Sequence, residues 1–239
     1  MGATKVVDRL IDAVPYLRVT VRSAPEAAKR WSRESLVRDS RTLGGLAEST
    51  TSGHGTDHDQ ITVSLFNQDY AFRIASIAIG AWLLDDVIVD VAPTRTSIAS
   101  GRSRPGAVHL DKVCVVAPED SLATIHAQSI QSHFCLLVAN AHRVCRVGDT
   151  LLWANVGAAC APSFAAFTDP LPELGALGWL VVVGDGWVWE RRACYLWYQT
   201  SGASRYDDCS LRTPEECRSC YEGARLAHDE QSTNSEVSS

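Results

Sequence analysis

The chain has 239 residues, of which 46% are hydrophobic and 21% are charged, the composition of an ordinary globular protein. Its formal net charge of −6 argues against a nucleic-acid-binding surface, which would need a basic face. Residues 1–8 carry charges where a secretory signal would be apolar, and the longest apolar run, 74–84, is too short to cross a bilayer. We therefore expect a cytoplasmic protein with no nucleic-acid partner and no membrane span.

The first quarter of the chain is predicted to contain a strand, a helix and a loop. Residues 17–22 alternate apolar and polar side chains, as a half-buried strand does. Residues 25–37 have the partial apolar face of a helix, and Ser23 can cap it. Residues 43–60 are rich in Gly, Ser, Thr and Asp and have no hydrophobic period after Leu46, so we expect a loop there.

Within this loop, the segment His54-Gly55-Thr56-Asp57-His58-Asp59 contains residue types that bind metal ions. We interpret it as a solvated polar loop, because a loop lacks the rigid helix or strand that fixes ligand geometry. It is therefore not among the site residues that the sequence predicts.

The middle of the chain is predicted to form a helix followed by two strands. Residues 69–84 have apolar side chains at helical intervals, with small Ala and Gly residues that allow close packing. Residues 87–91 and 108–116 are rich in β-branched side chains, which favours strands. The segment 100–106 between them is typical of a connecting turn.

Two long helices are predicted to follow. Asp120 or Ser121 can cap a helix that runs to about Cys145. Residues 150–167 form the second helix, in which Pro162 should produce a kink or a break. Both segments are rich in Ala, Val and Leu, so we expect the two helices to pack together as the core.

Beyond these helices the sequence predicts a β-hairpin and a polar tail. The apolar runs 179–183 and 187–190 flank Gly184-Asp185-Gly186, a turn signal. The last residues, 226–239, cannot bury apolar surface and should be disordered. Five histidines show no ligand-like pairing on a short segment, and we expect them to be structural: His109, His126, His133, His142 and His228.

The chain contains eight cysteines, which in a reducing cytosol are not disulfide partners by default. The four scattered through apolar segments are expected to be small buried hydrophobic residues: Cys114, Cys135, Cys145 and Cys160. The other four are clustered and have polar neighbours: Cys194, Cys209, Cys217 and Cys220. This second group is the strongest candidate for a functional site.

The clustered cysteines have the character of a thiolate metal site. Cys217-Arg218-Ser219-Cys220 is a C-x-x-C pair, whose two sulfurs can reach one metal from a tight turn, and Cys194 and Cys209 supply two further ligands. A thioredoxin-type redox pair is disfavoured, because that motif begins a helix after a strand in a βαβ unit. A structural zinc site and an iron–sulfur cluster are equally compatible with four thiolates. The fold class that we expect is therefore α+β, a helix-rich domain with a small antiparallel sheet and a C-terminal cysteine-rich metal-binding segment.

A family resemblance bears on this choice. The stretches Arg191-Arg192-Ala193-Cys194, Leu196-Trp197-Tyr198 and Asp207-Asp208-Cys209-Ser210-Leu211 resemble the C-terminal motif of the FhuF-like ferric-siderophore reductases. That family holds a [2Fe-2S] cluster with a Cys-Cys-x10-Cys-x2-Cys pattern, whose outer cysteines are as far apart as Cys194 and Cys209. Residues 152–159, 70–84 and 85–91 are similar to earlier parts of the family, so the resemblance covers most of the chain.

The chain departs from the family motif at two positions. Tyr195 and Tyr206 stand where the family has its second and third cysteines, and phenolates are poor substitutes for thiolates. Cys217 and Cys220 follow shortly afterwards, and we expect them to replace the lost pair. The alternatives are a zinc-stapled, non-redox binding module and a relative that binds siderophores but has lost its cluster.

The resemblance implies an enzyme that reduces siderophore-bound Fe(III) by one electron and so releases the iron. Its partners would be a ferric siderophore and an electron donor, either a ferredoxin or a flavoprotein. Arg191 and Arg192 could offset the cluster charge or attract an anionic chelate, and Trp197 and Tyr198, with Trp187 and Trp189, could wall the site. The expected domains are a substrate-binding helical core, a hairpin with the iron–sulfur segment, and the tail: 1–169, 170–225 and 226–239.

Overall fold

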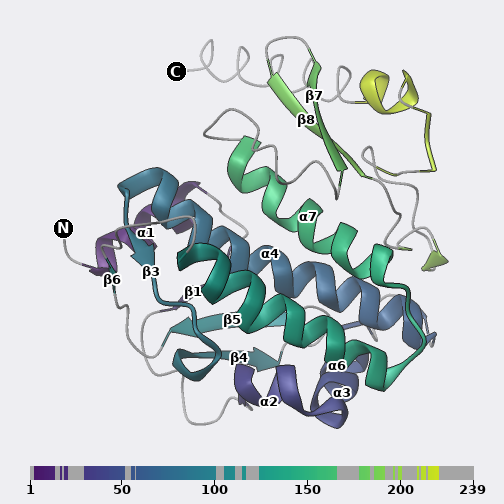
Figure 1. Ribbon diagram of the computed structural model, residues 1–239, viewed down its shortest axis with the longest axis horizontal. Coiled ribbons are helices and arrows are strands. Elements are labelled where there is room, and N and C mark those ends of the chain that lie inside the picture. Colours follow the sequence, from purple (N-terminus) through teal and green to yellow (C-terminus); the bar gives the residue numbers. More distant parts are fainter. Residues whose placement is uncertain are drawn as a thin grey trace, which may run out of the picture.

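The computed structural model (Figure 1) describes the chain over much of its helical part and over shorter stretches near its carboxyl end. The described residues are 3–13, 17, 19–20, 30–51, 55–56, 58–100, 105–110, 115–116, 124–165, 178–183, 186–191, 196, 199–200, 209, 211–213 and 215–220. The tail 226–239, Ser23, the turn residues 184–185 and Cys114 lie outside them.

The structure is rich in helices, as the sequence predicts. The helical elements are α1 (Ala3–Ala13), α2 (Arg33–Arg38), α3 (Ser40–Thr51), α4 (Asp59–Asp85), η2 (Pro93–Arg95), η3 (His126–Cys135), α6 (Leu136–Val144) and α7 (Asp149–Ala165). The strands are β1 (Val19–Thr20), β2 (Arg30–Ser32), β3 (Ile88–Val89), β4 (Thr96–Ser100), β5 (Pro105–Leu110), β6 (Val115–Val116), β7 (Gly178–Val183) and β8 (Gly186–Arg191). None of the helices in the described part of the chain combines the length and the apolar character that a membrane crossing requires.

Helix α4, 27 residues long, is the centre of the core (Figure 1). Apolar side chains occur around most of its circumference, which is the pattern of a helix enclosed by other elements. It packs against α1, α3, α7 and the sheet. The predicted helix 69–84 is confirmed, although the helix begins ten residues earlier, at Asp59.

Small residues let neighbouring helices approach α4 closely, as expected. A Cβ atom at Gly80 would lie 2.6 Å from the Leu10 side chain of α1, so a larger residue here would force the Leu10 side chain to shift. The same two helices are joined by an ion pair between Arg9 and Asp85, at the end of α4. Burial and charge pairing together fix α1 against the carboxyl end of α4.

Helix α7 runs beside α4, and buried amides join the two (Figure 1). The Asn67 amide donates to the Leu152 carbonyl oxygen over 2.9 Å, and the Asn155 amide donates to the Ser64 carbonyl oxygen over 2.9 Å. The two helices that we expect to pack together as the core both contribute to it, but they contact each other only slightly, and the main partner of α7 is α4. Helix α7 is also continuous through Pro162 and is not broken there.

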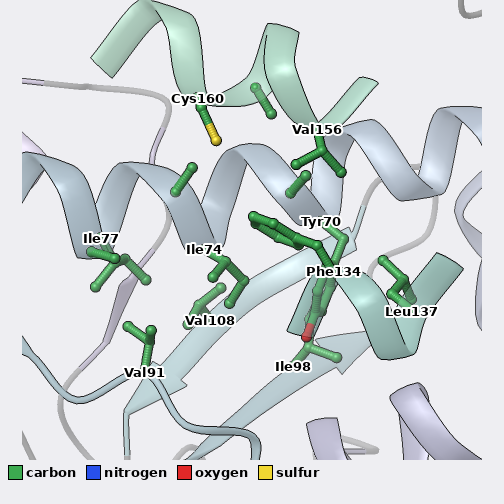
Figure 2. Packing of buried hydrophobic residues seen from close by; sticks show 14 of the residues in the cluster. Tyr70, Ile74, Ile77, Val91, Ile98, Val108, Phe134, Leu137, Val156 and Cys160 are labelled. Carbon is green, nitrogen blue, oxygen red and sulfur yellow. The ribbon is translucent and has the colours of Figure 1, made fainter. Parts of the chain in front are cut away.

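A four-stranded sheet, in the order β1-β5-β4-β2, covers another face of α4. Strand β1 pairs parallel with β5, whereas β5 with β4 and β4 with β2 are antiparallel, so this sheet is mixed. Figure 2 shows the buried side chains of Ile98 and Val108 from this sheet, facing Tyr70 and Ile74 of α4. Two further antiparallel pairs, β3 with β6 and β7 with β8, lie outside it, and the second is the predicted hairpin.

The expected loop over residues 43–60 is wrong in its first half, which is helix α3. Leu43, Leu46 and Ala47 are buried and form one short apolar stripe against the core. The helix is preceded by Asp39, whose carboxylate accepts hydrogen bonds from the Thr42 hydroxyl (2.6 Å) and the Thr42 backbone N–H (3.3 Å). The bond from the Thr42 hydroxyl is the main cause that lowers the pKa of Asp39. An acidic N-cap residue marks the beginning of a helix. The polar, glycine-containing composition of the segment obscured this signal.

Two strand assignments also differ from expectation. Residues 30–32, predicted as helix, form β2 and pair with β4, and only 33–38 of that segment is helical. The single strand expected over 108–116 is two short strands, because β5 ends at Leu110 and β6 pairs with β3 in a separate ladder. These differences share a cause: the pairing partner is distant in sequence and leaves no local signal.

A buried histidine joins η3 to α4 and to the segment after β3. The Nε2 atom of His133 lies 2.5 Å from the Val91 carbonyl oxygen, which can only accept, so Nε2 carries the proton. The Nδ1 atom therefore accepts a hydrogen bond from the Tyr70 hydroxyl over 2.7 Å. Figure 2 shows Tyr70 at this position, close to Phe134. The expectation of a structural histidine is confirmed for His133.

Replacing Tyr70 with Phe keeps the ring but removes the donor to His133. We predict that Tyr70→Phe lowers the free energy of unfolding by about 1–3 kcal/mol, the cost of leaving a buried acceptor unpaired. Urea denaturation followed by circular dichroism measures this change. An unfolding midpoint equal to that of the wild type would show that this hydrogen bond contributes nothing to stability.

Candidate metal-thiolate segment and the adjacent cleft

Three of the four clustered cysteines are described, and two of them lie together. Cys209 and Cys217 are buried, with 3% and 5% of their surface exposed, and Cys220 is partly buried. All three are free thiols. The Cys217 thiol donates to the Cys209 carbonyl oxygen, with a sulfur–oxygen distance of 3.8 Å. The structure thus places the first thiol of the C-x-x-C pair against the Cys209 backbone.

A capping box holds the C-x-x-C pair on a short helical segment, residues 215–220. The Thr213 backbone N–H donates to the Glu216 carboxylate (2.7 Å), and the Glu216 backbone N–H donates to the Thr213 hydroxyl (3.2 Å). Positions three apart on a helix share a face, so Cys217 and Cys220 occupy the same side of this segment. The local sequence therefore explains why both thiols are presented in one direction.

The remaining predicted site residues cannot be placed. Cys194, Arg192, Tyr195, Trp197, Tyr198 and Tyr206 lie outside the described residues, and Arg191 is described only as the end of β8. Among the residues that are described, no group of three or more His, Cys, Asp or Glu side chains is arranged to hold a metal ion. The four-thiolate ligand set therefore remains a prediction.

Leu196 anchors the motif segment to the start of α4. It packs against Ile61 and Leu65, which form a small apolar cluster separate from the main core. Its φ angle is 70°, a left-handed conformation that a bulky residue rarely adopts. Strained backbone of this kind concentrates at functional sites, where the surrounding structure must hold it. Here it occurs only two residues after Cys194 in the sequence.

A cleft of about 430 Å³ opens beside this anchor. It is lined by residues 58–61 at the start of α4, by Cys145 and Arg146 after α6, and by Gln199. The Gln60 side-chain amide donates to the Arg146 carbonyl oxygen over 2.5 Å and ties two of the walls together. Burial, and secondarily the negative charge of Asp59, raises the pKa of the Cys145 thiol. This thiol is therefore protonated at neutral pH and is not an activated nucleophile.

The sequence did not identify this cleft. Residues 54–59 were interpreted as a solvated loop, but His58 and Asp59 are the cap and first residue of α4. The signal that could have found them is the apolar pattern of α4, which begins at Ile61, two residues after Asp59. Arg146 and Gln199 come from distant parts of the chain and have no local signal.

The scattered cysteines agree only partly with the expectation of burial. Cys160 is buried, which raises the pKa of its thiol to about 12. Figure 2 shows it pointing from α7 toward α4. Cys145 is half-buried, and Cys135 is exposed, so the expectation was wrong for Cys135. Cys135 is the last residue of η3, and its side chain is exposed to solvent. The hydrophobicity of the segment does not show which of its side chains are exposed.

Comparison with known proteins adds no family assignment, because neither protein-family models nor curated proteins give a significant match to this chain. The resemblance to FhuF-like reductases therefore stays a prediction from the motif.

Because the Cys160 thiol is buried, we predict that the protein loses stability at alkaline pH. In the unfolded chain this thiol ionises near pH 9.0, whereas in the folded protein it keeps its proton to about pH 12. Its contribution is therefore complete below pH 9 and is lost as the pH rises above 9, by up to about 1.4 kcal/mol per pH unit. We expect the unfolding free energy of the wild type to fall relative to that of Cys160→Ala between pH 8 and pH 10.5. Cys135→Ala, at an exposed thiol, is the control, and a pH-independent difference for Cys160→Ala would contradict the prediction.

Proposed function

We propose that this chain is a cytoplasmic ferric-siderophore reductase whose C-terminal segment binds a [2Fe-2S] cluster through Cys194, Cys209, Cys217 and Cys220. The observation that supports it most is the contact between the Cys217 thiol and the Cys209 carbonyl. In the family motif Cys209 corresponds to the last ligand, and the contact joins it to the pair that would replace Tyr195 and Tyr206. The proposed division is a helical body, residues 1–169, and a hairpin with the cysteine-rich segment, residues 170–225.

The proposed reaction needs few protein groups. When bound, the cluster supplies a single electron, received from a ferredoxin or flavoprotein, to the Fe(III) of the chelate. Siderophores hold Fe(III) with hard oxygen donors, which bind the less charged Fe(II) more weakly, so reduction releases the iron. The protein holds the thiolates in a buried position and orients the chelate beside them. Arg191 and Arg192, which adjoin the motif in sequence, would offset the negative charge of a tetrathiolate site.

A zinc site is the second candidate, and one feature favours it. The C-x-x-C pair lies on a short capped helix, an arrangement that a structural Zn²⁺ ion could staple to Cys209. Such a protein would bind metal without transferring electrons. A relative that has lost its cluster would hold neither metal.

We predict that protein purified without oxygen contains iron and acid-labile sulfide, and that Cys217→Ser and Cys220→Ser each lose at least half of both. Serine removes a thiolate ligand while leaving side-chain size nearly unchanged. Iron, zinc and sulfide assays with an absorption spectrum measure this. Cys135→Ser, which changes an exposed thiol on η3, should leave the metal content unchanged.

Each outcome discriminates between the candidates. Zinc without sulfide would establish the stapled module instead of the reductase. Iron that is unaffected by both substitutions would exclude Cys217 and Cys220 as ligands, and a protein with neither iron nor zinc would exclude both metal sites.

A further inference from the structure

We propose that the cleft at the start of α4 binds the ferric chelate and prefers negatively charged chelates, with Arg146 attracting the ligand and Asp59 opposing it. This inference rests on the proposed function for the identity of the ligand. The site itself is defined by the described residues alone.

The size and chemistry of the cleft suit an oxygen-rich small molecule. Its volume, about 430 Å³, falls within the range of about 300–1,000 Å³ that small-molecule sites occupy. Three of its lining residues have side chains that can donate hydrogen bonds: His58, Arg146 and Gln199. Ile61 adds an apolar contact. Chelates that bind iron through catecholate or hydroxamate oxygens present the complementary acceptors.

The charge distribution favours an anion. The cleft lies at the amino terminus of a 27-residue helix, where the first backbone N–H groups, at residues 59–61, precede the first intrahelical hydrogen bond, from Thr62 N–H to the His58 carbonyl oxygen. Arg146, which follows Cys145 in the lining, adds a full positive charge. Asp59 adds a negative charge, and its effect on the Cys145 thiol locates that charge near Cys145. The lining therefore carries one positive and one negative side chain, and the amino terminus of α4 tips the balance toward an anion.

The position of the cleft links it to the thiolate segment. Gln199, which lines the cleft, and Leu196, which packs on the cleft residue Ile61, both belong to the stretch between Cys194 and Cys209. The Gln199 backbone N–H donates to the Leu196 carbonyl oxygen over 2.9 Å, so the two residues form one turn. A chelate in the cleft would contact the same short turn that follows the first motif cysteine.

The test uses gallium, which matches Fe(III) in charge and size but accepts no electron here, so binding is measured apart from reduction. Titration calorimetry of the full-length protein with the Ga(III) tris-catecholate trianion should show saturable binding. We expect Arg146→Gln to weaken this binding about tenfold, the value of one charge-assisted contact, and Asp59→Asn to strengthen it. Arg95→Gln, which changes an exposed arginine in η2 that does not line the cleft, is the control and should leave the binding unchanged.

Opposite signs for the two cleft variants separate charge effects from structural damage, since damage would weaken binding in both. A cationic Ga(III) trihydroxamate should show the reverse response to each substitution. Absence of binding, or equal binding by wild type and Arg146→Gln, would overturn the inference. If the protein binds the gallium chelate but contains no iron or sulfide, the cleft is a chelate site and the proposed reductase function is refuted. If the protein contains an iron–sulfur cluster but Arg146→Gln does not change chelate binding, only the cleft proposal is refuted.

Discussion

The enclosure of α4 by apolar contacts is the constraint on which the described structure depends. Helices α1, α3 and α7 and the mixed sheet all pack against it, and the buried amides of Asn67 and Asn155 fix the position of α7. Because the body of α4 is buried, its first turn is held rigidly at one end of the core. That end carries His58 and Asp59, so residues that would be mobile in a loop have a defined geometry.

The carboxyl-terminal segment uses this rigid end as its anchor. Leu196, whose backbone is strained, contacts Ile61 and Leu65. The Cys209 carbonyl oxygen accepts a hydrogen bond from the Cys217 thiol. Both contacts reduce the freedom of a segment that has little apolar surface of its own. A metal bound by the cysteines would add a third constraint and would couple the order of this segment to its metal content. The turn formed by Leu196 and Gln199, which borders the cleft, lies in sequence between Cys194 and Cys209.

The predictions from sequence succeeded where the signal was local and strong. The apolar periodicity of residues 69–84 and the turn between two apolar runs near residue 184 identified α4 and the hairpin. They failed at α3, where the glycines at 44 and 45 obscured an apolar stripe of one turn, and at β2, whose partner β4 is far away in the chain. The C-x-x-C pair was visible as a motif, but its contact with Cys209 was not. The cleft was missed because its walls come from three separate segments that only the tertiary fold brings together.

The most direct test of the central claim is a single-turnover reduction. Protein reduced with dithionite under anaerobic conditions, and then freed of excess reductant, is mixed with a ferric trihydroxamate in the presence of an Fe(II)-specific chelator. We expect about one Fe(II) to form for each reduced [2Fe-2S] cluster, while the absorption of the oxidised cluster returns at the same rate. Reduced protein that yields no Fe(II) above the level of the protein-free control would contradict it.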